Sequence, residues 1–202
     1  MEESRPGEYL PVEENERGTF IFNSRDLCMI EHIPDLCRAG ISSLKIEGRM
    51  KTALYVATVA RTYRKAIDDF YESEDTYLSH MEWYRREIRK CTYRRFTTGF
   101  YYGRPEAESM VYDSNTYVNE SVWLGIAEEV KNHRVRFTQR NKFSVGDTIE
   151  IMKPDGRDIP ARVLELTTPE GESVESAPHP QQVLYAGLSA DAEKGDILRM
   201  DG

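Results

Sequence analysis

Three charged residues that lie close together have the types and spacing best suited to chemistry: Lys45, Glu47 and Arg49. Lys45 and Glu47 are two residues apart, so in a β-strand both side chains lie on the same face. The planar guanidinium of Arg49 can hold a carboxylate or a phosphate through two parallel hydrogen bonds. Two interpretations stay open: Glu47 and Arg49 bind or polarise an anionic substrate, or these charges form a structural ion pair.

A second candidate position comes earlier, where Asn23 and Ser24 follow the strand-forming run Thr19–Phe22. In a parallel barrel Asn23 lies on the same rim as Glu47, so it joins the candidate catalytic residues. Ser24 is better suited to cap a helix than to act as a nucleophile, because no histidine stands in a triad relation to it.

Cys28 falls in the first turn of the helix expected after Ser24, where a helix N-terminus lowers the pKa of a thiol. It is either a thiol that faces the rim or a small buried side chain. Cys37 and Cys91 are expected to be buried and inert. The three cysteines fit neither a disulfide framework nor a zinc site, and the four histidines give no metal-ligand spacing.

A basic run lies in and just after a helix expected from Ser79 to Cys91. Tyrosines are interleaved with it, so it resembles a surface that follows a phosphate backbone and stacks on bases. The alternative is an ordinary solvated helix face. The candidate RNA-binding residues are Arg85, Arg86, Arg89, Lys90, Arg94 and Arg95.

The elements that must position these residues alternate in the first half of the chain. We expect strands at 19–22 and 41–47, a helix after Ser24, and a long helix along 53–67. Pro34 either kinks the first helix or begins a second short one that ends at Gly40. The order β, α, β, α is typical of parallel strands with crossover helices. Two such units cannot close a sheet, so they require the rest of a larger α/β domain.

From about Ser121 the sequence changes to short strand-forming runs separated by turns. Strands are expected at 122–130, 134–138, 148–153, 159–166, 183–187 and 196–200. The phrase Val145-Gly146-Asp147 recurs as Lys194-Gly195-Asp196, each a turn that leads into a strand. Six strands at this spacing predict a small closed antiparallel barrel. The fold class is therefore α/β plus all-β, with an α/β domain over 1–104, a linker over 105–119 and a β-barrel over 120–202.

The bulk properties describe a soluble protein of 202 residues with 39% hydrophobic residues and a net charge of -8. No apolar run is long enough to cross a bilayer, and the first residues resemble neither a signal nor a transit peptide. We therefore expect a cytoplasmic protein. The sequence does not indicate its oligomeric state.

Three phrases resemble peptidase family U32, the collagenase-like protease family: Phe22 to Cys28, Ser43 to Lys51 and Thr97 to Tyr101. The phrase from Gln139 to Asp147, together with His179 to Gln182, resembles the longer members of the family. These members append a small β-barrel similar to the second domain of translation elongation factors. The resemblance covers nearly the whole chain. The branch of the family with the appended barrel resembles proteins needed for hydroxylation of the wobble uridine of transfer RNA.

The resemblance implies a TIM-like barrel in the first domain, ended here by its last βα units. It also implies an iron–sulfur cluster and prephenate for the whole protein, with Cys28 as one cluster ligand. For this chain alone we expect no cofactor and no catalytic activity, because most of the family's cysteines would lie upstream of Met1. Transfer RNA is the expected partner. A collagenase-like endopeptidase acting on a peptide and a non-catalytic binding module stay open as alternatives.

Overall fold

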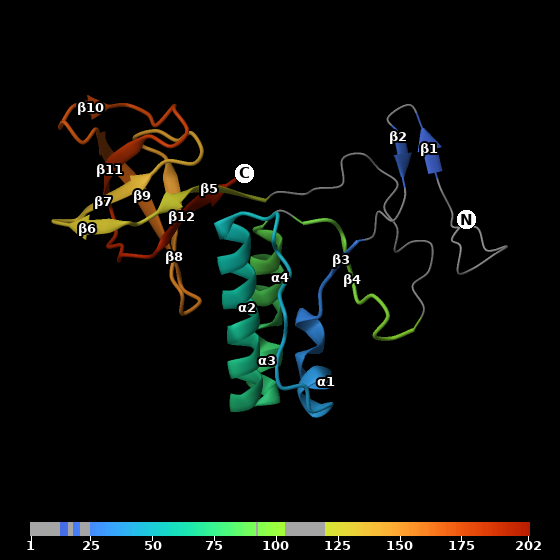
Figure 1. Cartoon of the computed structure of the whole chain (residues 1–202). Helices are drawn as coiled ribbons and strands as arrows, with labels where there is room; N and C mark the ends of the chain where they lie inside the picture. The colour runs from blue at the N-terminus through green and yellow to red at the C-terminus, as the bar shows by residue number, and fades with distance from the viewer. Residues whose placement is uncertain (1–12, 16–17, 21–24, 92, 104–119) are drawn as a thin grey trace. The chain divides into compact units, whose positions relative to one another are not determined.

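The computed structural model of the chain describes residues 13–15, 18–20, 25–91, 93–103 and 120–202 (Figure 1). The chain divides into two compact units, residues 1–29 with 93–118 and residues 30–92 with 119–202. The first unit contains short strand pairs, and the second contains helices and an antiparallel sheet. None of the described helices combines the length and the apolar character needed to span a bilayer.

Two strand pairs are described in the first unit. β1 (Glu13–Asn15) pairs antiparallel with β2 (Gly18–Phe20), and β3 (Asp26–Leu27) pairs parallel with β4 (Phe96–Thr97). The Asp26 carboxylate fixes the parallel pair, because it accepts hydrogen bonds from the Arg94 backbone N–H at 2.9 Å and from Arg94 Nε at 3.1 Å.

The prediction of a helix directly after Ser24 was wrong. Asp26 and Leu27 form strand β3, and the 3-10 turn η1 (Ile30–His32) leads into α1 (Ile33–Arg38). Pairing with β4 overrides the local capping signal, which is a weak preference by comparison. Pro34 lies in the first turn of α1, where its missing N–H leaves no bond unmade. This confirms the alternative in which Pro34 begins a second short helix; Asn23 and Ser24 lie outside the described residues.

The segment 41–47 is not a strand, although its sequence predicted one. It has no regular secondary structure, and most of its side chains are exposed. A strand is held by hydrogen bonds to a neighbouring strand, and none of the described strands pairs with this segment. The expected order β, α, β, α is therefore not found in the described part of the chain.

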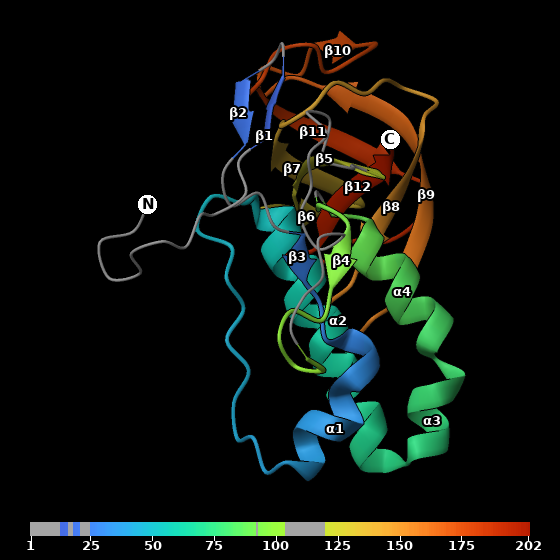
Figure 2. The ribbon, with the colours of Figure 1, turned by 90° about the vertical axis from the view of Figure 1, so that its right-hand side faces the viewer.

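Three helices follow: α2 (Ala53–Glu72), α3 (Glu74–Ser79) and α4 (Met81–Arg89). Thr52 caps the start of α2, since its hydroxyl oxygen accepts the Tyr55 N–H at 3.2 Å. α3 and α4 follow one another alongside α2 (Figures 1 and 2). Tyr77 and Tyr84 are buried between them and stack with ring centroids 5.5 Å apart. The helices expected at 53–67 and 79–91 are thereby confirmed, with shifted ends.

The second half of the chain folds as an antiparallel sheet, as its sequence predicted, but the single strand expected at 122–130 is two separate strands. Its strands are β5 (Ser121–Ile126), β6 (Glu129–Lys131), β7 (Arg134–Thr138), β8 (Thr148–Met152), β9 (Asp158–Thr167), β10 (Ser173–Val174), β11 (Val183–Leu188) and β12 (Ile197–Asp201). The hydrogen-bonded order is β5-β12-β8-β9-β11-β7-β6, and β10 adds to β9. Figure 2 shows the long strand β9 beside β8. Alternate residues of these strands form one apolar core that includes Leu124, Phe137, Ile151 and Leu184.

The expected closed barrel does not form, because β5 and β6 at the two ends of the described sheet are not paired. These two strands are consecutive in the chain, and Ala127 between them bonds instead to the Asp196 carbonyl at 2.8 Å. A backbone bond of 2.9 Å from Arg140 N–H to the Leu124 carbonyl links the end of β7 to β5. The sheet is therefore strongly curved but open.

The two Gly-Asp turns predicted from the sequence are confirmed. Gly146 and Gly195 have φ angles of 94° and 97°, a region that glycine adopts without strain. In each turn the aspartate carboxylate accepts the backbone N–H of the residue three positions earlier, at 2.8 Å for Asp147 and 2.7 Å for Asp196. The turns lead into β8 and β12.

A buried network of charges joins the helices to the sheet. Arg199 of β12 is fully buried and lies between three carboxylates, those of Glu87, Glu150 and Asp158. Its Nη2 is 2.9 Å from Glu87 Oε2 and 2.9 Å from Asp158 Oδ1, and its Nε is 3.0 Å from Glu150 Oε2. Because α4, β8 and β9 supply these carboxylates, one guanidinium contacts both layers.

Two further cations complete the network. Arg61 of α2 bonds to Glu87 and lies 2.9 Å from Asp158 Oδ1, and Lys90 lies 2.7 Å from Glu150 Oε2. Burial alone would raise the pKa of the Glu87 carboxyl, but Arg199, Arg61 and Lys90 together lower it. Burial would likewise raise the pKa of the Glu150 carboxyl, but Lys90 and Arg199 together lower it.

Replacing Arg199 with methionine should destabilise the chain strongly. The substitution leaves Glu87 buried without its central cation, a change that costs about 3–5 kcal/mol in comparable buried pairs. Urea unfolding followed by circular dichroism measures the loss. Arg157→Met is the matched control, because Arg157 pairs with Asp155 at the surface, where ion pairs contribute at most about 1 kcal/mol. Equal effects of the two variants would contradict a special role for Arg199.

The stability of the chain should decrease in acid. Glu87 and Glu150 have pKa values lowered from 4.5, so both carboxylates stabilise the fold above that pH and lose this contribution as the pH falls through their folded pKa. Thermal unfolding measured from neutral to acidic pH should reveal the decline, and Glu150→Gln should flatten it. Glu82→Gln, at an exposed carboxylate, is the control. If Glu150→Gln leaves the loss of stability in acid unchanged, other groups cause that loss.

Candidate functional site

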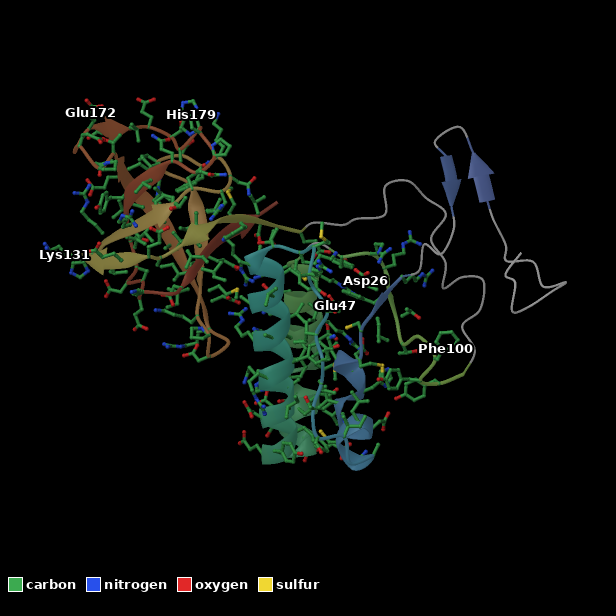
Figure 3. The ribbon with its side chains drawn as sticks, in the orientation of Figure 1. Asp26, Glu47, Phe100, Lys131, Glu172 and His179 are labelled. Carbon is green, nitrogen blue, oxygen red and sulfur yellow. The ribbon has the colours of Figure 1, made fainter. Side chains whose placement is uncertain are left out.

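Lys45, Glu47 and Arg49 lie on the exposed segment before α2, where Figure 3 labels Glu47. Lys45 Nζ is 3.7 Å from Glu47 Oε2, and the two side chains are 87% and 72% exposed. The Arg49 N–H donates to Glu47 Oε1 at 3.3 Å, and the Tyr55 hydroxyl donates to the Glu47 carbonyl at 3.3 Å. The three predicted residues are thus neighbours, but no burial strengthens their charges.

The cysteines occupy three different surroundings. Cys28 directly follows β3 and is half-buried, with its backbone N–H bonded to the Thr97 carbonyl at 2.9 Å. It does not lie in a helix, so the expected effect of a helix N-terminus on its thiol does not apply. Cys37 is half-buried, whereas Cys91 is buried and its Sγ donates to the Ile88 carbonyl at 3.1 Å. Among the described residues no group of three or more cysteine, histidine or acidic side chains could hold a metal ion.

A buried carboxylate that the sequence did not reveal is Asp69, near the end of α2. The Tyr84 hydroxyl donates to Asp69 Oδ2 at 2.5 Å, His80 Nδ1 lies 2.9 Å from the same atom, and Lys65 Nζ is 3.1 Å from Oδ1. Burial opposes these bonds, but together they lower the pKa of the Asp69 carboxyl. The cluster connects α2 to the start of α4 and serves the helix packing.

Half of the predicted basic run is engaged in ion pairs. Arg85 lies 2.5 Å from Glu31 Oε2 and 2.6 Å from Glu82 Oε1, and hydrogen bonds to both carboxylates raise the pKa of Arg85. Lys90 belongs to the buried network, and Arg94 holds Asp26 in the first unit. These three residues therefore have structural partners.

The other half of the basic run is exposed. Arg86 and Arg89 lie three residues apart on α4, and Arg95 precedes β4. None of the three forms an ion pair with an acidic side chain among the described residues. Arg86 and Arg89 are therefore the members of the run on α4 that best fit contact with an anionic partner.

A groove of about 400 Å³ runs between α1, α2 and the segment 41–46. Its lining is mostly apolar and includes Ile33, Leu44 and Ile67, with Cys37 at its wall. Arg64 also lines the groove, but its Nε already donates to Asp68 Oδ2 at 2.9 Å. The groove therefore has room for a small ligand but few polar side chains to bind one.

Three consecutive aromatic side chains lie on the turn after β4: Phe100 is 79% exposed, Tyr101 56% and Tyr102 58% (Figure 3). Gly99 begins the turn with a φ of 58°, and its N–H donates to Thr97 Oγ1 at 3.1 Å. Phe100 and Tyr101 belong to the phrase Thr97 to Tyr101, which resembles the family and for which the sequence predicted no role. Exposed aromatic rings of this kind can stack on bases.

The sequence also agrees with known protein families. The profile of peptidase family U32 matches residues 1–111, and the profile of the peptidase family U32 C-terminal domain matches residues 120–199. The two profiles cover both halves of the chain.

Three relatives indicate the range of proteins with similar sequences. The chain is 34% identical over 206 residues to the tRNA hydroxylation protein P of Escherichia coli, covering 98% of this chain and 43% of that protein. It is 31% identical to the tRNA hydroxylation protein P1 of Bacillus subtilis, over 91% of this chain and 44% of that protein. A collagenase of Porphyromonas gingivalis is 29% identical over 81% of this chain and 46% of its own length.

The chain thus spans less than half the length of these relatives. The first profile alone matches more than half of the chain, and both profiles describe the same family. The resemblance noted in the sequence is confirmed, and the chain belongs to peptidase family U32.

Proposed function

We propose that this chain takes part in the hydroxylation of a wobble uridine in transfer RNA, where it contributes to binding the RNA. The observation that carries the proposal is the similarity to two tRNA hydroxylation proteins over 91% and 98% of the chain. Arg86 and Arg89 on α4 support it, since both are exposed, neither forms an ion pair with an acidic side chain among the described residues, and such arginines suit a phosphate backbone.

A collagenase-like endopeptidase is the second candidate, favoured by the similarity to the Porphyromonas gingivalis protein. Peptide hydrolysis needs an activated nucleophile or a metal-bound water. The described residues contain no group suited to a metal, and Glu47 is exposed beside Lys45. The higher identity to the two tRNA hydroxylation proteins, over more of the chain, favours RNA modification over proteolysis; a binding module without chemistry is the third candidate.

We further propose that the first half of the chain belongs to a TIM-like domain and that the protein is cytoplasmic. The parallel pair β3 and β4 supports such a domain, because parallel strands are typical of it. The described residues do not fit an iron–sulfur cluster by themselves, since Cys28, Cys37 and Cys91 form no ligand group. If Cys28 serves as one ligand of a cluster in the whole protein, Cys28→Ala should remove its visible absorbance.

Mass spectrometry of transfer RNA nucleosides separates the two catalytic candidates. A strain that lacks the gene should lose hydroxylated wobble uridine if the proposal holds, and a copy with both Arg86 and Arg89 changed to Glu should restore it only in part. Unchanged nucleosides, together with peptide cleavage by the purified whole protein, would instead support the endopeptidase.

Changing Arg86 and Arg89 to glutamate should weaken the binding of transfer RNA by this chain. With each phosphate contact that is lost, fewer counterions are released from the RNA on binding. Both the affinity and its dependence on salt should therefore decrease. Filter binding at several salt concentrations measures both quantities. The matched control changes Arg64 and Arg157 to glutamate, because these exposed arginines already pair with Asp68 and Asp155. Equal binding by the two double variants would show that the exposed face of α4 is an ordinary solvated face that does not contact RNA.

A further inference from the structure

Two loops that are far apart in the sequence are joined at one end of the β-sheet domain. The Gln139 N–H donates to the Gln182 carbonyl at 2.9 Å, and the Gln181 N–H donates back to the Gln139 carbonyl at 2.8 Å. The Gln139 side chain is buried, and its Nε2 donates to the Ala177 carbonyl at 2.9 Å. These bonds fix Gln139 against residues 177–182, the loop that contains His179 (Figure 3).

A cation is stacked on an aromatic ring beside these loops. The Arg140 guanidinium carbon lies 5.0 Å from the centroid of the Trp123 ring. The Arg140 backbone N–H donates to the Leu124 carbonyl at 2.9 Å, and Asn141 Nδ2 donates to the Trp123 carbonyl at 2.7 Å. These bonds hold the backbone on both sides of the stack, and the Trp123 ring packs against the apolar cluster of Leu54, Met152 and Ile197, so a ligand would find this cation on a fixed support.

The charges near this stack differ from those on the rest of the sheet domain. Apart from Arg140 and Lys142, five of the eight lysines and arginines in residues 120–202 lie against carboxylates: Arg134 against Glu165, Arg136 against Glu128, Lys153 against Asp196, Arg157 against Asp155, and Arg199 against Glu87. Arg140 and Lys142 are exposed, and neither forms an ion pair with any acidic side chain in the described part of the chain. In a chain with a net charge of -8, this leaves a local positive surface open to an anion.

We propose that Trp123, Arg140, Lys142 and the loop 177–182, together named the Trp123 surface, form a second RNA contact. Arg140 and Lys142 contact phosphates, and the guanidinium plane that lies on Trp123 offers a flat face for an unpaired base. The inference rests on the proposed RNA-binding function and adds a site on the sheet domain, separate from α4. Lys131, Arg162 and Lys194 are also exposed cations, but no aromatic stack accompanies them among the described contacts.

The test compares two charge-matched double variants in their binding to a labelled single-stranded oligouridine. Changing Arg140 and Lys142 to glutamate should weaken binding about tenfold and reduce the slope of log affinity against log salt by about 0.7 for each lost phosphate contact. Changing Lys131 and Lys194 to glutamate makes the same change in net charge and should have a much smaller effect. Circular dichroism and urea unfolding confirm that both variants are folded, and the milder change of Arg140 and Lys142 to glutamine should give an intermediate loss.

A second measurement reports on the site directly. The chain has two tryptophans, Trp83 and Trp123, so Trp83→Phe leaves Trp123 as the only indole fluorophore. Oligouridine should change its fluorescence in a saturable, salt-sensitive way, and the change should disappear when Arg140 and Lys142 are glutamate.

Three results would overturn the inference, and they are distinguishable. If the unaltered chain does not bind oligouridine or transfer RNA, the inference fails together with the RNA-binding function on which it rests. If the chain binds RNA but the Arg140 and Lys142 variant binds equally well with no Trp123 response, only the Trp123 surface is rejected. If polyglutamate at the same charge concentration competes as well as RNA, the surface recognises acidic proteins instead.

Discussion

The guanidinium of Arg199 contacts acidic side chains from three elements, α4, β8 and β9, and this contact fixes how the helices pack on the sheet. A buried charge is tolerated only while its partners stay in place, so small shifts of α4 against the sheet are unfavourable. Such a network adds less stability than an apolar core would, but it specifies one arrangement. It also explains why one compact unit combines residues matched by both U32 profiles, because Glu87 belongs to the first and Arg199 to the second.

The pairing of charges within the chain also decides which basic residues can contact an anionic binding partner. On α4 the side chains of Arg85 and Lys90 are held by carboxylates, whereas Arg86 and Arg89 are exposed and form no ion pair with an acidic side chain of the described residues. The sequence displays all of them as one basic run, since it does not reveal Glu31 or Glu150 as partners. A run of like charges in a sequence is therefore an upper limit on the cations that a partner can meet.

Local patterns predicted what local physics determines. The antiparallel strands of the second half, the long helix α2 and the two Gly-Asp turns follow from alternation, helical spacing and glycine at positive φ, which are properties of neighbouring residues. The failures involve distant partners. Asp26 joins a strand because Phe96 and Arg94 are available, the segment 41–47 lacks a described neighbour, and the sheet stays open because Ala127 bonds to Asp196. Of the candidate site, the sequence placed Lys45, Glu47 and Arg49 together, but it gave no sign of Arg199 within a strand of apolar residues.

Trp123 connects the rigid interior with the surface. One side of its environment is the apolar cluster of Leu54, Met152 and Ile197, which lies where α2 meets the sheet. Arg140 stacks on the same ring at the surface. The network around Arg199 holds α2 and β12 through Arg61 and Arg199 themselves, so it also holds the residues that support Trp123. A binding surface gains most from residues whose positions are already fixed, because less freedom is lost when the ligand arrives. The buried charges that the sequence concealed therefore support the stack of Arg140 on Trp123. Among the described contacts of the sheet domain, this is the stack whose cation has no acidic partner; Arg134, which lies over Tyr185, pairs with Glu165.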